Sequence, residues 1–186
     1  MKQAGLVFTF LLSLAVQAEP VVNYEKEAEA VAGQLLKELG SALKKQIQEG
    51  GPEQAVKVCS ELAPEIVNRL SIEKGWRITR VGTRVRNPLL GTPDRWEQEA
   101  LAYFERRAAG GNDLKDMSYS EIVEEPAGRY FRYMKPLVIK PLCMICHGEA
   151  SQIPDTIKKT YPHDRATGYH VGDLRGGIVI KRPLSE

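Results

Sequence analysis

The first strong pattern in the chain is a helical stripe of apolar residues within a stretch otherwise rich in Lys, Glu and Gln. Its apolar positions recur every four residues: Val31, Leu35, Leu39, Leu43 and Ile47. This period predicts a long amphipathic helix from about 23 to 49, which Gly50-Gly51 would end. We expect its apolar face to pack within the chain. The alternative is a homo-oligomer that pairs through this helix.

A second helix is predicted to start at Pro52, because the missing N–H of proline costs nothing in a first turn. Its apolar stripe consists of Val56, Cys59, Ala63, Ile66, Val67 and Leu70. Cys59 is therefore expected on the face turned toward the core. Pro64 cannot donate to the carbonyl of Ser60, so we expect a kink or an early helix end there.

Alternating and apolar runs predict four strands. One spans 76–81, two form a hairpin at 119–125 and 130–139, and the last is the apolar run 178–180. This order of elements suits an α+β domain with an antiparallel sheet and helices packed on one side. It does not suit a regular βαβ series.

The segment between the first strand and the hairpin is predicted to hold a loop and a helix. The loop runs from Asn87 to Gly91. Thr92-Pro93-Asp94 is typical of a helix start, with Thr92 as the N-cap and Pro93 in the first turn. Gly110-Gly111 would end this helix.

The N-terminus has the pattern of a secretory signal peptide. Lys2 precedes an apolar run from Leu6 to Val16, and Val16-Gln17-Ala18 matches the small-residue cleavage pattern. We expect residues 1–18 to be removed and residues 19–186 to form a single domain, periplasmic or otherwise exported. No later stretch is long and apolar enough to span a bilayer.

Charge gives little indication of a partner. The chain has 26 basic and 24 acidic residues and a formal net charge of +2. This balance gives no reason to expect nucleic acid or a membrane surface as a partner.

The most specific motif is Cys143-Met144-Ile145-Cys146-His147, which reads C-x-x-C-H, the attachment sequence of a c-type haem. Two thiols three positions apart can each add across one vinyl group of the porphyrin. His147 then lies close enough to give the iron its proximal nitrogen. The motif predicts one covalently attached haem c.

A bare C-x-x-C also occurs in redox dithiols, structural disulfides and zinc sites. A zinc site needs a second pair of ligands, and Cys59, His163 and His170 are not paired at metal spacing. A thioredoxin-like dithiol would follow a strand in a βαβ pattern, which is not evident before Cys143. Because c-type haem is attached outside the cytoplasm, the predicted export signal favours haem.

Several stretches together resemble one family. They are Cys59-Ser60-Glu61-Leu62-Ala63-Pro64, Arg86-Asn87-Pro88, Pro93-Asp94-Arg95-Trp96-Glu97, the C-x-x-C-H motif, Tyr161-Pro162-His163-Asp164-Arg165-Ala166-Thr167-Gly168-Tyr169 and Gly172-Asp173-Leu174-Arg175-Gly176. From about 25 to 182 the chain resembles the exported single-haem c-type proteins with a PAS-like sheet, long catalogued as a domain of unknown function. It departs from their pattern at Gly177 and the run 178–180, where a small residue and a Ser-containing strand are expected.

The resemblance implies a PAS-like antiparallel sheet with long N-terminal helices and a covalent c-type haem. It also implies an unusual axial pair, with His147 on one side of the iron and Cys59 on the other. From the residues alone, a buried inert thiol is the favoured interpretation of Cys59, because a free cysteine packs like a small hydrophobe, and it is the resemblance that favours ligation. The rival sixth ligands are His163, His170, Met117 and Met134.

A haem also carries two propionates, which need cations or backbone donors. Arg84, Arg86 and Arg175 are the candidates, because a guanidinium binds a carboxylate in a bidentate way. For each of them, the alternative is an ordinary surface arginine.

Three functions are compatible with such a haem. In a redox or gas sensor, the soft thiolate–iron bond would weaken on reduction, a diatomic gas would displace Cys59, and a partner protein would receive the signal by docking. In a low-potential periplasmic electron-transfer carrier, two protein ligands would favour outer-sphere transfer to a redox partner. A peroxidase-like haem enzyme would need an open distal site and an acid–base residue, and the sequence identifies neither. We expect a haem protein without catalytic activity.

Overall fold

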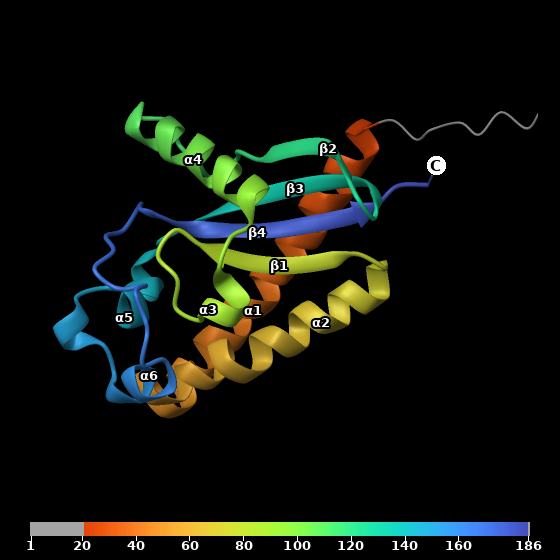
Figure 1. Cartoon of the computed structure of the whole chain (residues 1–186). Helices are drawn as coiled ribbons and strands as arrows, with labels where there is room; N and C mark the ends of the chain where they lie inside the picture. Colours follow the sequence, from red (N-terminus) through yellow and green to blue (C-terminus); the bar gives the residue numbers. More distant parts are fainter. Residues whose placement is uncertain (1–20, 186) are drawn as a thin grey trace, which may run out of the picture.

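The computed structural model describes residues 21–185, and the predicted signal peptide at 1–18 lies outside them. Its centre is a four-stranded antiparallel sheet in the order β1-β4-β3-β2 (Figure 1). The strands are β1 (Arg77–Gly82), β2 (Tyr119–Glu125), β3 (Gly128–Val138) and β4 (Leu174–Pro183). The predicted antiparallel sheet and hairpin are confirmed, and β4 extends beyond the three residues expected of it.

Helices precede β1, separate β1 from β2, and occupy the segment between β3 and β4. They are α1 (Val21–Lys57), α2 (Ala63–Lys74), α3 (Pro88–Gly91), α4 (Arg95–Ala109), α5 (Met144–His147) and α6 (Asp155–Thr160). A π-helical turn, η1 (Val58–Leu62), joins α1 to α2, and the 3₁₀ turns are η2 (Pro141–Cys143) and η3 (Ala150–Gln152). None of the described helices combines the length and the apolar character needed to cross a membrane.

Two irregularities divide the N-terminal helices. Gly51 has φ 68° and ψ −167°, a conformation that glycine adopts without steric cost, and α1 resumes at Pro52. The predicted helix break is therefore confirmed. The irregularity expected at Pro64 takes the form of η1, in which the N–H of Ala63 donates to the carbonyl of Val58, five residues earlier. Pro64 then lies in the first turn of α2, where its missing N–H costs little.

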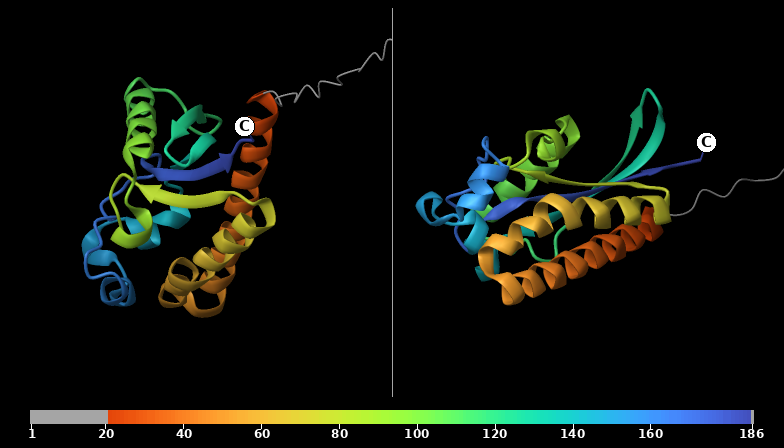
Figure 2. Two further views of the ribbon diagram at one scale, coloured as in Figure 1. Left: turned by 45° about the vertical axis from the view of Figure 1, so that its right-hand side comes forward. Right: turned by 90° about the horizontal axis from the view of Figure 1, so that it is seen from below.

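Helices cover both faces of the sheet. α1 and α2 run side by side on one face, and α4 lies on the other (Figures 1 and 2). The side chains of β4 alternate accordingly: Ile178 and Ile180 pack in the core under α1 and α2, whereas Val179 packs in the core under α4. The expectation of helices on one side only is wrong. Because this run of β4 has no polar face, both faces require an apolar cover.

The start of α4 lies two residues beyond the predicted position. The N-cap is Asp94: its side chain accepts from the N–H of Glu97 at 2.9 Å, and the Glu97 carboxylate accepts from the N–H of Asp94 at 2.7 Å. This reciprocal capping box satisfies two donors. The hydroxyl of Thr92, the predicted cap, donates instead to the carbonyl of Pro88 at 2.7 Å. The stretch expected as a loop contains the single turn α3, which Asn87 caps.

Arg132 on β3 ties the N-terminus of α4 to the sheet. The residue is 5% exposed, and its guanidinium lies 2.7 Å from Asp94, 3.4 Å from Glu97 and 3.6 Å from Glu125. Its central carbon lies 4.4 Å from the ring centre of Trp96. A buried cation among carboxylates is stable only while its partners are present, so the position of α4 depends on this set.

Replacing Arg132 with Met is expected to lower the free energy of unfolding by about 3 kcal/mol, because the buried carboxylate of Glu97 loses its partner. Urea denaturation followed by circular dichroism measures the loss. Arg129→Met, on the same strand but with an exposed side chain, is the matched control and should cost less than about 0.5 kcal/mol. Equal losses in the two variants would contradict this role of Arg132.

Candidate functional site

The C-x-x-C-H residues form a short helical segment between β3 and β4. Cys143 ends η2, and α5 carries Cys146 and His147. Residues three positions apart in a helix lie on the same side, so the two thiols project in similar directions. The N–H of Gly148 closes the turn by donating to the carbonyl of Met144 at 2.8 Å. A β-carbon at Gly148 would clash with that carbonyl, which explains the glycine at this position.

The two thiols lie in different surroundings. Cys146 is buried among apolar side chains such as Val56 and Ile157, and Cys143 is half-buried. Burial, with a smaller contribution from Cys59, raises the pKa of Cys146 to about 11. The thiol is therefore protonated at neutral pH. Within residues 21–185, no three Cys, His, Asp or Glu side chains converge as ligands for a metal ion.

The ring of His147 is held in one tautomer. Its Nδ1 lies 2.7 Å from the carbonyl oxygen of Ala166. Because a carbonyl only accepts, Nδ1 carries the hydrogen and Nε2 keeps its lone pair. Burial, together with the charges of Arg86 and Arg175, lowers the pKa of His147 to about 3, so the ring is neutral. Histidines that bind metals adopt this arrangement.

Arg86 fixes the carbonyl that orients His147. Arg86 is 8% exposed, and its Nε donates to the carboxylate of Asp164 at 2.9 Å. Its Nη2 donates to the carbonyl of Ala166 at 3.3 Å and to the carbonyl of Cys146. Asp164 also accepts from the N–H of Ala166 at 2.7 Å. Arg86 was predicted to bind a propionate; the structure places it in the cavity wall with two of its nitrogens engaged by the protein.

The segment that returns to β4 packs around the motif. The N–H of Tyr169 donates to the carbonyl of His147 at 3.0 Å, and the two rings meet edge to face with centres 6.0 Å apart. The guanidinium of Arg84 lies over the Tyr169 ring at 3.6 Å and donates to the carbonyls of Thr167 and Gly168. Arg84 is thus exposed and holds this loop, and it is not among the residues that line the cavity described next.

A cavity of about 430 Å³ lies between η1, α2, β1 and the motif. Cys59, from η1, and His147, from α5, both line it. Most of its wall is apolar or glycine, and the larger apolar residues are Pro64, Val67, Ile78, Val81, Val85, Leu90 and Leu137. Cys59 was expected to face the core, but it is half-buried and faces this cavity. The volume is in the range of cofactor sites, and the two side chains are both able to bind iron.

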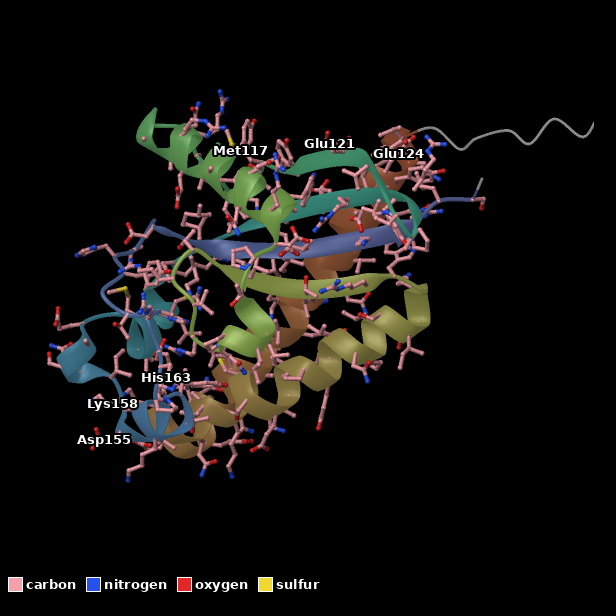
Figure 3. All side chains as sticks on the ribbon, in the orientation of Figure 1. Met117, Glu121, Glu124, Asp155, Lys158 and His163 are labelled. Atoms are coloured by element: carbon pink, nitrogen blue, oxygen red, sulfur yellow. The ribbon has the colours of Figure 1, made fainter. Side chains whose placement is uncertain are left out.

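The rival iron ligands lie elsewhere. His163 and His170 are exposed, and Figure 3 shows His163 beside α6, on the side of the molecule where Asp155 and Lys158 lie. Met134 is buried in the core under α4, and Met117 packs against the same core. None of these four described residues lines the cavity that His147 and Cys59 share.

Arg175 reaches the cavity between β1 and β4. Gly82 and Gly176 are partners in the register of these strands, and a β-carbon on Gly82 would clash with the Arg175 guanidinium. Nη1 of Arg175 donates to the carbonyl of Arg84 at 3.1 Å. Its buried Nε has no hydrogen-bond partner among the described residues. Arg175 lines the cavity and has no carboxylate partner among the described residues, which fits a group that carries carboxylates, as haem does.

A family model described as Tll0287-like matches residues 17–183. The chain belongs to the Tll0287-like family. Its structure is similar to a solved structure titled "Crystal structure of the cyanobacterial heme-protein Tll0287", with a TM-score of 0.64 and 23% sequence identity over 88% of this chain and 94% of that chain. At this identity, the likeness concerns the α+β fold. A search of curated proteins found no match.

One charged residue of the cavity was not predicted from the sequence of this Tll0287-like chain. Arg80 on β1 lines the cavity and is half-buried. Ile78, two positions earlier, packs in the core under α1 and α2. Side chains two apart on a strand share a face, so Arg80 points to the same side of the sheet. A charged residue at an inward position of the alternating pattern was the signal that could have identified it.

In this Tll0287-like protein, Arg86→Met is expected to lower the free energy of unfolding by about 3 kcal/mol, because Asp164 would lose its buried partner. Amide hydrogen exchange should also become faster in residues 161–169, which the ion pair holds against the motif. Urea denaturation and hydrogen-exchange mass spectrometry measure the two effects. Arg165→Met changes an exposed side chain of the same loop and should leave both near the wild-type values. Unchanged exchange in Arg86→Met would show that the ion pair does not hold the loop.

Proposed function

We propose that this chain binds one haem c, attached through thioether bonds to Cys143 and Cys146, with His147 and Cys59 as the axial ligands of the iron. The observation that carries the proposal is that His147 and Cys59 line one cofactor-sized cavity from separate elements. The C-x-x-C-H motif and the similarity in fold to a protein titled as a heme-protein support it. When bound, haem supplies a one-electron Fe(III)/Fe(II) couple.

The two proposed ligands have different roles. His147 offers a neutral Nε2, because Ala166 holds the hydrogen on Nδ1. Cys59 offers sulfur, which a ferric ion stabilises as the anion. Because an anionic ligand favours the ferric state, Cys59 would lower the reduction potential of a bound haem. The apolar residues of the cavity wall would contact the apolar face of the porphyrin.

The proposed role is redox or gas sensing outside the cytoplasm, without catalysis. Cys59 lies in η1, whose hydrogen bonding spans one residue more than in an α-helix. Such turns have an α-helical alternative and are frequent at functional sites. A change in η1 would rotate Cys59 away from the cavity when its bond to iron weakens on reduction. Because η1 joins α1 to α2, a signalling partner that docks on these helices would detect the change.

A low-potential electron-transfer carrier is the second candidate. The same pair of cavity side chains favours it, because two protein ligands leave no open position for a substrate. A carrier would require Cys59 to stay in place through oxidation and reduction, so that little rearrangement accompanies electron transfer to a redox partner.

Produced in a host that attaches c-type haem, the protein is expected to gain the mass of one haem and to show a low-spin ferric spectrum with a thiolate charge-transfer band in the near infrared. Cys59→Ser should keep the covalent haem and lose this band. Ser60→Ala, a change at the next position of η1, should keep both. An unchanged band in Cys59→Ser would remove Cys59 from the iron, and a wild-type protein without haem would refute the proposal as a whole.

Gas binding separates the sensor from the carrier. If Cys59 leaves the iron on reduction, the reduced protein should bind CO or NO without denaturation, which absorption spectroscopy detects. The oxidised protein, in which sulfur is held more firmly, should bind CO far less. A reduced protein that is indifferent to both gases and exchanges electrons rapidly with a soluble redox partner would favour the carrier.

A further inference from the structure

The charges around the cavity are not balanced. Three arginines line it, Arg80, Arg86 and Arg175, and its described lining contains neither Asp nor Glu. Arg86 is neutralised by Asp164, whose carboxylate lies 2.9 Å from it. Arg175 makes a hydrogen bond to a backbone carbonyl and leaves its buried Nε without a partner. Two positive charges at the cavity therefore lack a carboxylate.

Arg80 is the less compensated of these two. It has no hydrogen bond or ion pair to any residue of the described chain, and it is half-buried beside Cys59 and Tyr161. Burial lowers the pKa of its guanidinium. By contrast Arg77, on the same strand, is exposed and lies near Asp94 and Glu97. A half-buried guanidinium that lines a cavity and lacks a carboxylate partner is well placed to pair with a bound group that carries negative charge.

The haem proposed above would supply the missing negative charges, both in their number and as carboxylates. It carries two propionates, and two guanidinium groups at the cavity lack acidic partners. The carboxylate of a propionate accepts two parallel hydrogen bonds from a guanidinium. The sulfur of Cys59 has less need of a protein cation, because the iron itself neutralises it.

We propose that Arg80 binds one haem propionate as an ion pair and that Arg175 binds the other. The assignment rests on the haem binding proposed above. It explains why β1 carries a charged residue on its inward face. The sequence-based candidates for the propionates were Arg84, Arg86 and Arg175, and the proposal keeps Arg175 but replaces the other two with Arg80.

The test compares three variants of the haem-loaded protein: Arg80→Met, Arg80→Lys and the matched control Arg77→Met. The readouts are the midpoint potential, the propionate bending bands in the resonance Raman spectrum and the near-infrared thiolate band. Loss of a cation beside the haem favours the ferric state. We therefore expect Arg80→Met to lower the ratio of ferrous to ferric protein about tenfold at a fixed potential, equivalent to a negative shift of about 59 mV. Its propionate bands should shift, and its thiolate band should not.

Arg80→Lys retains the charge and should keep most of the wild-type potential, and Arg77→Met should keep all three readouts unchanged. Unshifted propionate bands in Arg80→Met would overturn the proposal, and so would a shift confined to the thiolate band, which would place Arg80 at the sulfur of Cys59 instead. Because the haem is held covalently, these variants keep it even when the ion pair is lost. A wild-type protein that binds no haem refutes the proposed function, and this result is distinct from every outcome of the comparison of variants.

Discussion

A buried ion pair holds the proposed functional end of the molecule together. Arg86 follows β1, and Asp164 belongs to the loop that returns to β4, yet the two side chains meet at 2.9 Å almost out of contact with water. Through the carbonyls of Cys146 and Ala166, the same guanidinium fixes the motif and the group that orients His147. Because a buried charge without its partner is costly, these segments keep their positions only together. The free lone pair on Nε2 of His147 thus depends on the Arg86–Asp164 ion pair, which the ring does not contact directly.

β1 connects this end of the molecule to the rest of the fold. Ile78 belongs to the core under α1 and α2, and Val81 to the core under α4. Between them, Arg80 faces the cavity, and Gly82 leaves the space that the side chain of Arg175 occupies. The strand can serve all of these sites because the run 178–180 of its neighbour β4 is apolar on both faces and is covered on both. The position of the cavity therefore follows from the packing of the sheet.

Features that depend on neighbours in the sequence were predicted well. Alternation located β1 and the hairpin, and Gly51 broke α1 as expected. Features that depend on residues far apart in the sequence were not predicted. Nothing near Arg86 in the sequence reveals that Asp164 is its partner. Arg80 was overlooked because the cavity exists only where η1, α2 and β1 meet. The cap of α4 was misplaced because a reciprocal pair satisfies more donors than the simpler Thr-Pro start does.

The two residues proposed to hold the iron lie far apart along the chain. About 90 positions separate Cys59 from His147, and a cross-link that closes a loop of this length stabilises a fold by about 4–5 kcal/mol through the entropy of the unfolded chain. In the proposed holoprotein, one metal atom bonded to both side chains is such a cross-link. Such a cross-link would weaken when one electron reduces the metal, whereas breaking a disulfide takes two. Oxidation state and resistance to proteolysis would then be coupled, and the reduced holoprotein would be the form that unfolds sooner and is degraded first.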